Sequence, residues 1–588
     1  MLPPLHLLYS GIGILAALTL VSVIASALTL VFSWGLLRYY RRAVEKSMAA
    51  RTTPQGRPAG DTAEQPSSTG AEVEPKLRHL PFQPSSQSDT REQFYRRALY
   101  SPWRHAFKYA IAGLFYAAIL AVGSYYAFSQ LLINPLAAAK HPAQWLFWFW
   151  TFCWPVVLTT EFVAATARKS RYLLPAGYCA VLVLLSLYAA WIPTESPLSS
   201  GNVTMLAWSG ETPLRLLAKW NLYNFAPTLL TVGFRNRRVR AVAPLVLSFM
   251  TIVTFGLVGV YFGAFYYLEA SVRIIALLMG QLGVHAHWAV AGYFTLLASL
   301  TCVAFALPGW WVMKGIRAGY ERKVISDQSL ALDSLWLVFA VFYAAILFFA
   351  GIGWGLWAVA AYIAFKLALR LAYWLVPEKT QYGKALLILR VFSLGKRSEA
   401  LFDVVSRHWR YIGNVQLIAG PDLAISTVAP HRFLAFLSGK LGHLFVNDAL
   451  SMEHHMQALD AKPDRDGRFR INDFFCRADT WQNVLKRLVA GSDAVLMDLR
   501  SFSQDNDGCL YEIKELLQRV PLSRIVFVID ESTKHDFLRR TLADCCAALP
   551  SESPNFGASA SDVQTSNLKS LECGEVENLL RRLCSAAA

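Results

Sequence analysis

The chain has 588 residues, of which 55% are hydrophobic and only 16% are charged. Roughly 25% of the residues of an ordinary soluble protein are charged, so this composition excludes a protein that is soluble over its whole length. The net charge of +16 comes mainly from Lys and Arg that flank apolar segments, where such residues act as topology signals. This placement argues against a nucleic-acid partner.

Apolar runs fill much of the first two thirds of the chain. A run of about 18 or more apolar residues can cross the ~30 Å hydrocarbon core as a helix. The first run is too long for a signal peptide and lacks a preceding basic region, so we expect it to remain as an anchor at 1–37. Eight such segments are residues 7–37, 109–133, 144–167, 172–193, 241–266, 288–312, 334–350 and 354–376.

The distribution of basic residues predicts a ninth crossing. Lys and Arg gather in four segments, and the loops 134–143 and 267–287 hold only one each. Cytosolic loops are enriched in Lys and Arg, and all four segments lie inside only if residues 213–233 also cross. We therefore predict about nine spans, an outside amino terminus and a cytosolic carboxyl terminus. The four basic segments are 38–108, 168–171, 235–240 and 314–323.

Residues 38–108 are expected to form a cytosolic linker, largely disordered, before the transmembrane bundle at 109–376. The part at 51–92 is rich in Ser, Pro, Gly, Gln and Glu and lacks aliphatic periodicity. Such a composition buries too little apolar surface to offset chain entropy, so we expect it to be disordered and dispensable for folding. Residues 91–108 mix basic and aromatic residues, which is typical of an amphipathic segment at a lipid surface.

Ionisable residues inside membrane spans are costly and usually functional. Glu161, Lys366 and Arg370 lie near the inner ends of their spans, within reach of the interface. The sequence contains no transporter or selectivity-filter motif. It favours an anchor or sensor, with a regulated channel or transporter as an alternative.

From residue 384 to residue 588 apolar runs alternate with helical periodicity. Continuous apolar runs such as Ala385–Phe392 are typical of parallel strands buried on both faces. The alternation predicts a cytosolic α/β domain with a doubly wound, mostly parallel sheet. Expected strands are 385–392, 415–419, 494–499, 524–529 and a short one near 562–568; expected helices are 398–411, 432–446, 481–489, 509–520, 537–549 and 576–583, with a charged loop at 448–468.

Ligands of doubly wound sheets bind beyond the carboxyl ends of the strands. Glu512 falls in the first turn of the helix after one such strand, where the helix amino terminus stabilises a carboxylate. We expect Arg390 or Phe392 to lie close to the 501–512 segment, and a functional site requires Glu512 to be partly exposed in a pocket. The segments that follow the expected strands are 390–395, 420–422, 501–508 and 530–533.

Three motifs make this domain similar to a known family. They are Ile388-Leu389-Arg390-Val391-Phe392-Ser393, Asp479-Thr480-Trp481-Gln482 with Val484, Leu488 and Asp493-Ala494-Val495-Leu496, and Cys509-x-x-Glu512-Ile513. Over about residues 385–550 the domain resembles the TIR-like domains that bacteria attach to membrane segments. Gly508 stands where the family usually has Trp.

The resemblance implies a protein of the bacterial plasma (inner) membrane that acts in signalling or defence and self-associates through this domain. It also implies an NAD-like nucleotide as substrate or ligand. Glu512 is then the expected catalytic residue, since the matching glutamate acts in NAD cleavage in catalytic members. The expected nucleotide-binding residues are Arg390, Phe392, Asp422, Ser501 and Phe502.

The chemistry of NAD cleavage suits a carboxylate at this position. Breaking the nicotinamide–ribose bond creates an oxocarbenium-like centre that a neighbouring carboxylate stabilises. A glutamate early in a helix is also often a capping residue, and Arg390 could pair with Asp498 or Glu512 as a structural ion pair. A non-enzymatic interaction or sensor domain that controls a membrane effector is therefore the alternative.

Metal and disulfide chemistry is not expected. The Glu-His-His sequence at 453–455 has no third ligand at a suitable spacing. The nine cysteines contain no C-x-x-C pair, and those of the α/β domain are expected to be reduced thiols.

Overall fold

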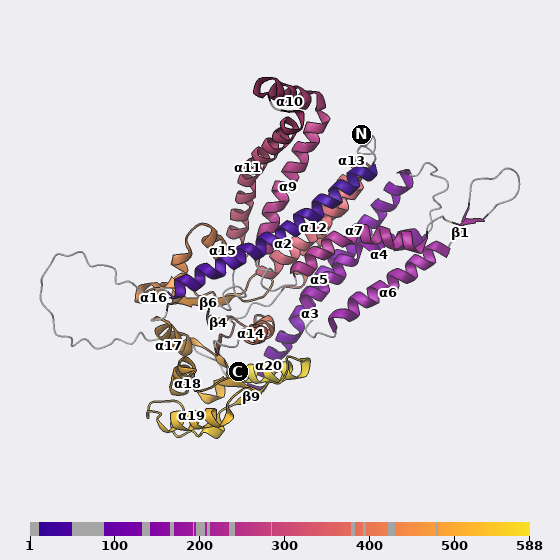
Figure 1. Cartoon of the computed structure of the whole chain (residues 1–588). Coiled ribbons are helices and arrows are strands. Elements are labelled where there is room, and N and C mark those ends of the chain that lie inside the picture. The colour runs from indigo at the N-terminus through magenta and orange to yellow at the C-terminus, as the bar shows by residue number, and fades with distance from the viewer. Residues whose placement is uncertain are drawn as a thin grey trace.

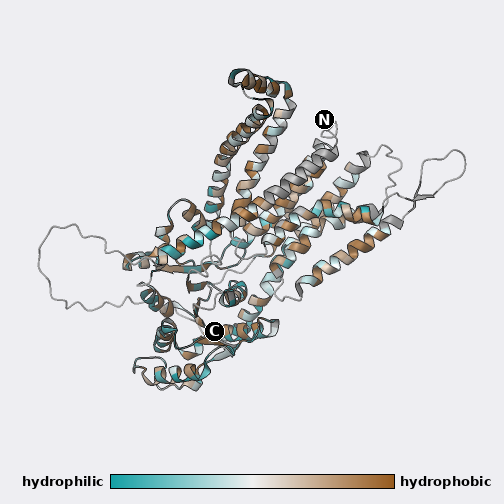
Figure 2. Cartoon of the chain, in the orientation of Figure 1, coloured by the Kyte–Doolittle hydropathy of each residue, from teal (hydrophilic) through white to brown (hydrophobic). Residues whose placement is uncertain are grey.

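A computed structural model of the chain consists of a mostly helical amino-terminal part followed by an α/β domain (Figure 1). Its long helices are predominantly hydrophobic, whereas hydrophilic residues gather on the α/β domain (Figure 2). The structure describes residues 11–49, 87–131, 142–164, 170–191, 193–195, 206–208, 212–234, 242–283, 285–377, 383–391, 396–420, 430–477 and 480–588.

Within the described residues, each apolar segment predicted as a span is helical, although the segment at 144–167 is divided into the two helices α4 and α5. Four helical segments, Arg91–Ala127, Trp145–Val163, Ala286–Glu321 and Gly353–Leu375, are long and apolar enough to cross a membrane. The helices of this part are α2 (Gly11–Ala49), α3 (Gln87–Leu131), α4 (Pro142–Phe152), α5 (Trp154–Ala164), α6 (Ser170–Trp191), α7 (Pro213–Phe234), α9 (Ala243–Tyr266), α10 (Leu268–Leu282), α11 (Ala286–Glu321), α12 (Asp327–Ala350) and α13 (Ile352–Leu375), with a small antiparallel pair of strands, β1 (Pro193–Glu195) and β2 (Leu206–Trp208).

The predicted linker is helical at both ends. α2 continues past the expected span to Ala49, and α3 begins at Gln87, so residues 38–49 and 87–108 are helical. The expectation of disorder at 51–92 falls largely on residues outside those described. On α3, Tyr95 and Ala98 are buried while Tyr100 and Trp103 are exposed, because the two faces of the helix meet different surroundings.

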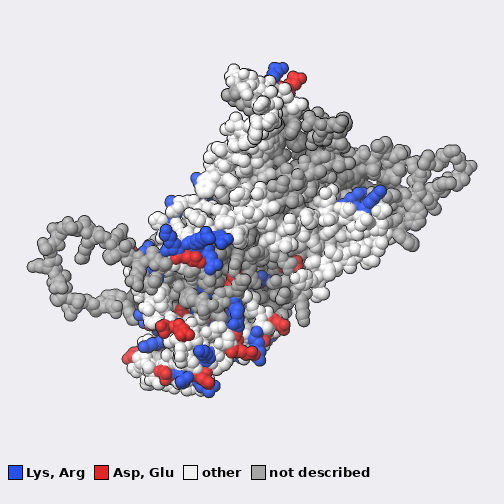
Figure 3. All heavy atoms as spheres, in the orientation of Figure 1, with Lys and Arg blue, Asp and Glu red and all other residues white. Residues whose placement is uncertain are grey.

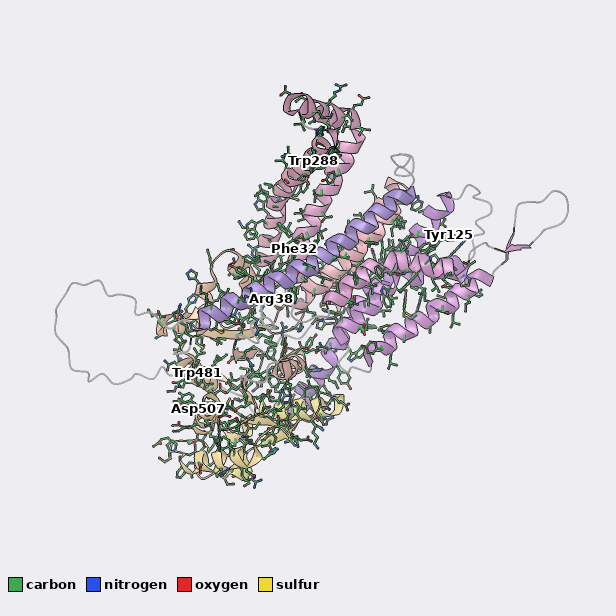
Figure 4. All side chains as sticks on the ribbon, in the orientation of Figure 1. Phe32, Arg38, Tyr125, Trp288, Trp481 and Asp507 are labelled. Carbon is green, nitrogen blue, oxygen red and sulfur yellow. The ribbon has the colours of Figure 1, made fainter. Side chains whose placement is uncertain are left out.

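The hairpin of α9 and α11, with α10 across its tip, projects away from the other helices (Figure 1). α9 has no charged residue and α11 has none before Lys314. The charges visible at its tip in Figure 3 belong to α10, which carries Glu269 and Arg273. Trp288, near the tip in Figure 4, and Trp311 are 65% and 68% exposed. They are about 35 Å apart along α11 at 1.5 Å per residue, and tryptophan prefers membrane–water interfaces.

Aromatic side chains fill the centre of the remaining helices. Tyr116 on α3, Trp336 and Tyr343 on α12 and Phe365 on α13 are almost completely buried and lie in ring contact. The Tyr343 hydroxyl donates a 2.7 Å hydrogen bond to the side chain of Asn224 on α7. This tight aromatic packing is typical of a structural core rather than of a water-filled path.

The α/β domain contains a parallel sheet, as the sequence predicts, but the sheet has seven strands rather than the five expected. The strand order is β5-β6-β4-β3-β7-β8-β9, and every pairing in it is parallel. The chain winds outward from β3 to one side and then returns to continue from β7 on the other. The strands are β3 (Leu386–Arg390), β4 (Val415–Ile418), β5 (Phe445–Val446), β6 (Ile471–Cys476), β7 (Ala494–Asp498), β8 (Ile525–Ile529) and β9 (Thr565–Asn567).

Helices cover both faces of this sheet, which completes the doubly wound arrangement. One face packs on α14 and α20 and the other on α17, α18 and α19. In Figure 1, α17, α18 and α19 lie on the side remote from the long helices, whereas α20 meets the base of α3. The helices are α14 (Lys396–Trp409), α15 (Pro430–Leu437), α16 (Ala449–Gln457), α17 (Trp481–Gly491), α18 (Asp507–Arg519), α19 (His535–Ala547) and α20 (Cys573–Ala586).

The face of the sheet that packs on α14 and α20 is its inner face, and it shares its hydrophobic core with the helical part. The face that packs on α17, α18 and α19 is the outer face. One contiguous cluster of buried apolar residues joins Tyr40 of α2 and Ala98 of α3 to Ile388 of β3. The Tyr40 ring lies 6.4 Å from Phe433 and 5.1 Å from Phe436 of α15. The two parts are therefore packed as one body at this junction.

Three details of the α/β domain differ from the sequence prediction. The helix expected at 432–446 ends at Leu437 and is followed by a short 3-10 turn and by β5. The charged segment at 448–468, predicted as a loop, contains α16. The strand β6, between β5 and β4, was not predicted, because two of its six residues are the polar Asn472 and Asp473.

Candidate functional site

The carboxyl edge between β3 and β7 is the point at which the chain changes winding direction. The helix after β3 lies on the inner face and the helix after β7 on the outer face. Doubly wound sheets bind their ligands at this kind of crevice. The last residues of the two strands, Arg390 and Asp498, are directly paired in register and are 4% and 1% exposed.

Two further arginines extend this edge. Arg500, two residues after Asp498, donates two hydrogen bonds to its carboxylate at 2.8 and 2.7 Å. Arg500 also donates to the backbone carbonyl of Arg397 at 3.1 Å. The Ser398 hydroxyl, in the first turn of α14, donates to Asp498 at 3.2 Å. These bonds tie the start of α14 to the end of β7.

The end of β8 completes the group. Arg397 pairs with Asp530, and the hydroxyl of Ser532 donates a 2.5 Å hydrogen bond to the same carboxylate. The hydroxyls of Ser532 and Ser501 lie 2.9 Å apart. We call the seven residues Arg390, Arg397, Asp498, Arg500, Ser501, Asp530 and Ser532 the edge cluster.

Ser501 has an unusual backbone conformation. Its φ is +61°, and among the described non-glycine residues only Lys323 also has a positive φ. Residues with side chains adopt this region at an energetic cost, and such strain concentrates at functional sites. The strain therefore coincides with the predicted ligand edge.

Glu512 lies under this edge in α18. It is 2% exposed, and its Oε2 atom has no hydrogen-bond partner among the described residues. Burial raises the pKa of Glu512 to about 8, and the positive charge of Arg390 only partly opposes this. The Cys509 thiol, one turn earlier, donates to the Arg390 carbonyl at 3.8 Å. Glu512 is therefore mostly protonated at neutral pH.

The predicted site residues differ in where the structure places them. Arg390 lies beside Glu512, as predicted, but Glu512 is buried rather than partly exposed in a pocket. Ser501 belongs to the edge cluster. Phe502 is completely buried and its ring lies 5.4 Å from that of Phe537, so it is a core residue. Phe392 and Asp422 lie outside the described residues.

Sequence reasoning did not identify Arg397 and Arg500. Arg500 occurs two residues beyond the end of β7, and Arg397 lies in the first turn of α14, the helix that follows β3. A position just after a strand is the signal that could have revealed Arg500. The edge cluster contains three arginines and two aspartates, so its net charge is about +1. The neighbouring Glu512 does not change this charge while it is protonated. Guanidinium groups and hydroxyls at such an edge suit a phosphate-bearing ligand.

The outer face of the sheet is a packed layer. Trp481 of α17 and Asp507 of α18 mark two of its three helices in Figure 4. The Trp481 ring meets Tyr511 edge-on at 5.4 Å. Asp507 is in the first turn of α18, six residues after Ser501 of the edge cluster. This packing fixes the direction of α18 and hence the position of Glu512.

A second charged group holds the α/β domain to the turn between α11 and α12. Arg410 donates two hydrogen bonds to Asp327 at 2.7 and 2.8 Å, and its side chain is only 6% exposed. Arg468 lies 3.7 Å from the same carboxylate. Burial by itself would raise the pKa of Asp327, but Arg410 and Arg468 together hold it well below its ordinary value.

The α11 side of this turn also contacts the α/β domain through charged residues. The guanidinium of Arg470 lies 3.8 Å from the centre of the Tyr320 ring and pairs with Asp464 at 2.7 Å. Lys323, with a φ of +60°, pairs with Asp460. We call the eight residues Tyr320, Lys323, Asp327, Arg410, Asp460, Asp464, Arg468 and Arg470 the docking cluster.

No family model, no curated protein and no solved structure matches this chain. Within the described residues, no group of three or more His, Cys, Asp or Glu side chains could hold a metal ion.

Proposed function

We propose that this chain is a bacterial plasma-membrane protein of signalling or defence whose cytosolic α/β domain binds an NAD-like nucleotide. The edge cluster receives the nucleotide and the docking cluster connects the domain to the membrane helices. Nine crossings, with the amino terminus outside, place this domain in the cytosol. The helices act as anchor and effector rather than as a transporter.

One observation carries the nucleotide proposal: three arginines converge on the crevice at which the sheet changes winding direction. Arg397 is the accessible member, since half of its side chain is exposed while it pairs with Asp530. A diphosphate can replace that carboxylate as the partner of the guanidinium. The resemblance of the 385–550 region to TIR-like domains supports an NAD-like ligand over other phosphates.

The sensor role rests on the packing between the two parts. The shared core and the docking cluster join the sheet to α2, α3, α11 and α12. A ligand that shifts β3, α14 or β7 therefore changes contacts that reach the helices. Such a shift requires the ligand to bind one arrangement more tightly than the other.

Ligand binding is tested by calorimetry on the full-length protein in detergent. NAD and ADP-ribose should bind, whereas nicotinamide riboside, which lacks the diphosphate, should not. Arg397→Gln should weaken NAD binding by roughly tenfold to a hundredfold, the effect of losing one charge-assisted hydrogen bond. Equal binding of nicotinamide riboside would contradict a diphosphate contact.

Arg407→Gln is the matched control for this variant. Arg407 is on the same helix, and its side chain pairs with Asp403 at 3.4 Å. The Arg407→Gln substitution removes the same charge and one ion pair, but at the opposite end of α14. NAD affinity should be unchanged, and an equal loss in both variants would indicate a general charge effect.

Hydrolysis of the nucleotide is the catalytic extension of this proposal. Glu512 is a buried carboxyl beside Arg390, and it is only 2% exposed. It can stabilise an oxocarbenium-like centre only when it is ionised and when nucleotide binding exposes it to the ribose. Because its pKa is raised to about 8, nicotinamide release should increase between pH 7 and 8.5 and be lost in Glu512→Gln. Binding without release would leave the sensor role alone.

The membrane topology has its own test. Reporter fusions at residues 60, 320 and 588 should report a cytosolic location, and fusions at 137 and 280 an outside location. An outside signal at 588 would contradict both the topology and access to a cytosolic nucleotide.

A further inference from the structure

A large cavity lies where α3 meets the α/β domain, apart from the edge cluster. Its volume is about 1110 Å³, slightly above the roughly 300–1,000 Å³ of small-ligand pockets. α3, α20, the segment after α13 and the loop before β6 form its walls. Its charged and aromatic lining includes Tyr95, Arg96, Arg97, Arg104, Glu577 and Arg581.

The lining of this cavity is basic. Four arginines outnumber two glutamates, Glu92 and Glu577, which leaves a net charge of +2. The guanidinium of Arg581 lies 4.4 Å from the centre of the Tyr95 ring, whose hydroxyl donates to Glu577 at 3.4 Å. These contacts orient α20 against α3 and fix one wall.

Arg96 and Arg104 belong to the opposite wall. Arg96 pairs with Glu92 at 2.8 Å across one turn of α3. Arg104 is exposed and makes no ion pair with the residues that the structure describes. Guanidinium groups bind phosphate oxygens through two parallel hydrogen bonds, which makes this wall suited to an anionic head group.

With the membrane placement of the proposed function, two exposed tryptophans beside the cavity put it near the membrane surface. Trp103 on α3 and Trp374 in the last turn of α13 are 54% and 74% exposed, and tryptophan prefers the head-group region. Pro377, three residues after Trp374, lines the cavity. Beyond Trp103, the exposed residues Phe107 and Ile111 continue along α3 as an apolar face.

We propose that this cavity binds the phosphate head group of an anionic phospholipid from the same leaflet. The arginines contact the phosphate, and the acyl chains lie against the exposed apolar face of α3. The occupied site bridges α3 and α20 and so stabilises the packing of the α/β domain on the helices. This inference rests on the membrane placement in the proposed function but not on nucleotide binding.

The test measures lipid retention by native mass spectrometry of the full-length protein in neutral detergent. The probes are dioctanoyl phosphatidylglycerol, dioctanoyl phosphatidylcholine and inorganic phosphate. Phosphatidylglycerol should be retained and should raise the melting temperature. Arg96→Gln with Arg104→Gln should weaken this retention at least about tenfold, as expected when charge-assisted hydrogen bonds are lost.

Arg42→Gln is the matched control, because Arg42 is an exposed arginine of α2 that does not line the cavity. It should leave retention unchanged. Equal retention of phosphatidylcholine, or an equal loss in the control, would overturn the proposal by showing that the cavity does not recognise the head-group charge. Inorganic phosphate that binds as tightly as the lipid would assign the site to a soluble anion and overturn the lipid source.

Failure of this inference is distinguishable from failure of the proposed function. Recovery of the protein from the soluble fraction without detergent would contradict the membrane placement itself. Arg397→Gln, which lies in the edge cluster, should leave lipid retention unchanged whatever it does to nucleotide binding. Loss of lipid retention in this variant would contradict the independence of the two sites.

Discussion

Glu512→Gln is the perturbation that most directly tests the description of the edge between β3 and β7. Glutamine keeps the shape of the side chain and cannot ionise. In the folded protein the pKa of Glu512 is raised from 4.5 to about 8. Each unit of pKa corresponds to about 1.4 kcal/mol. Folding therefore favours the neutral form of Glu512 over its ionised form by about 5 kcal/mol relative to the unfolded chain.

The direction of the pH effect follows from proton binding. Between pH 4.5 and 8 the folded protein retains the proton on Glu512, whereas the unfolded chain releases it. The free energy of unfolding therefore falls as pH rises through this window. Relative to Glu512→Gln, the wild-type protein should lose about 3 kcal/mol between pH 5 and pH 7.5.

Urea-dependent pulse proteolysis of the full-length protein in detergent measures this difference through the surviving α/β domain. Glu531→Gln is the control, since its carboxylate is 83% exposed and pairs with Lys569 at 3.5 Å. Its pH dependence should follow that of the wild type. Parallel wild-type and Glu512→Gln curves over the whole range would show that Glu512 titrates normally, and the inference from its burial would be wrong.

Two further substitutions test the junction and the sheet. Asp327→Asn leaves the buried Arg410 without its charged partner; because Asp327 is 34% exposed, the cost should be at the lower end of the buried range, about 3 kcal/mol. Limited proteolysis should then separate the α/β domain from the helices faster, and adding Arg410→Gln should recover part of the loss. Gly413→Ala places a Cβ atom 1.8 Å from the backbone oxygen of Lys384, so the α/β domain should fail to accumulate in protease-resistant form. Gly442→Ala meets no atom within 4 Å and should be tolerated.

The sequence predicted the centre of the sheet well for a physical reason. Parallel strands buried on both faces are continuous apolar runs, and β3, β7 and β8 are almost entirely buried. The apolar helices were equally evident from their length. Neither kind of element depends on residues far away in the chain for its pattern.

The elements that escaped prediction depend on distant partners. In β6, Asp473 pairs with Arg432 at 2.7 Å and the Asn472 side chain bonds to the backbone of Asp460. A local pattern that contains these polar residues indicates a loop until the partners are known. The start of α16 is different, because Asp448 and Ser451 form a capping box, which is a recognisable helix signal.

The candidate site was predictable in position but not in charge. Topology alone indicates the edge after β3 and β7, and Arg390 and Ser501 followed from it. The burial of Glu512 depends on how α18 packs, and the bond between Arg500 and the Arg397 carbonyl joins residues more than one hundred positions apart. The docking pair of Asp327 and Arg410 is likewise 83 residues apart.

The docking cluster contacts both sides of the turn between α11 and α12. These two helices belong to different parts of the molecule. α11 forms the projecting hairpin, whereas α12 belongs to the aromatic-cored bundle. α11 has 36 residues and is therefore about 54 Å long. A lever of that length converts a rotation of about 5° at the turn into a displacement of about 5 Å at the far end. A small tilt of the sheet at this turn would thus become a movement of α10 at the far end of the hairpin.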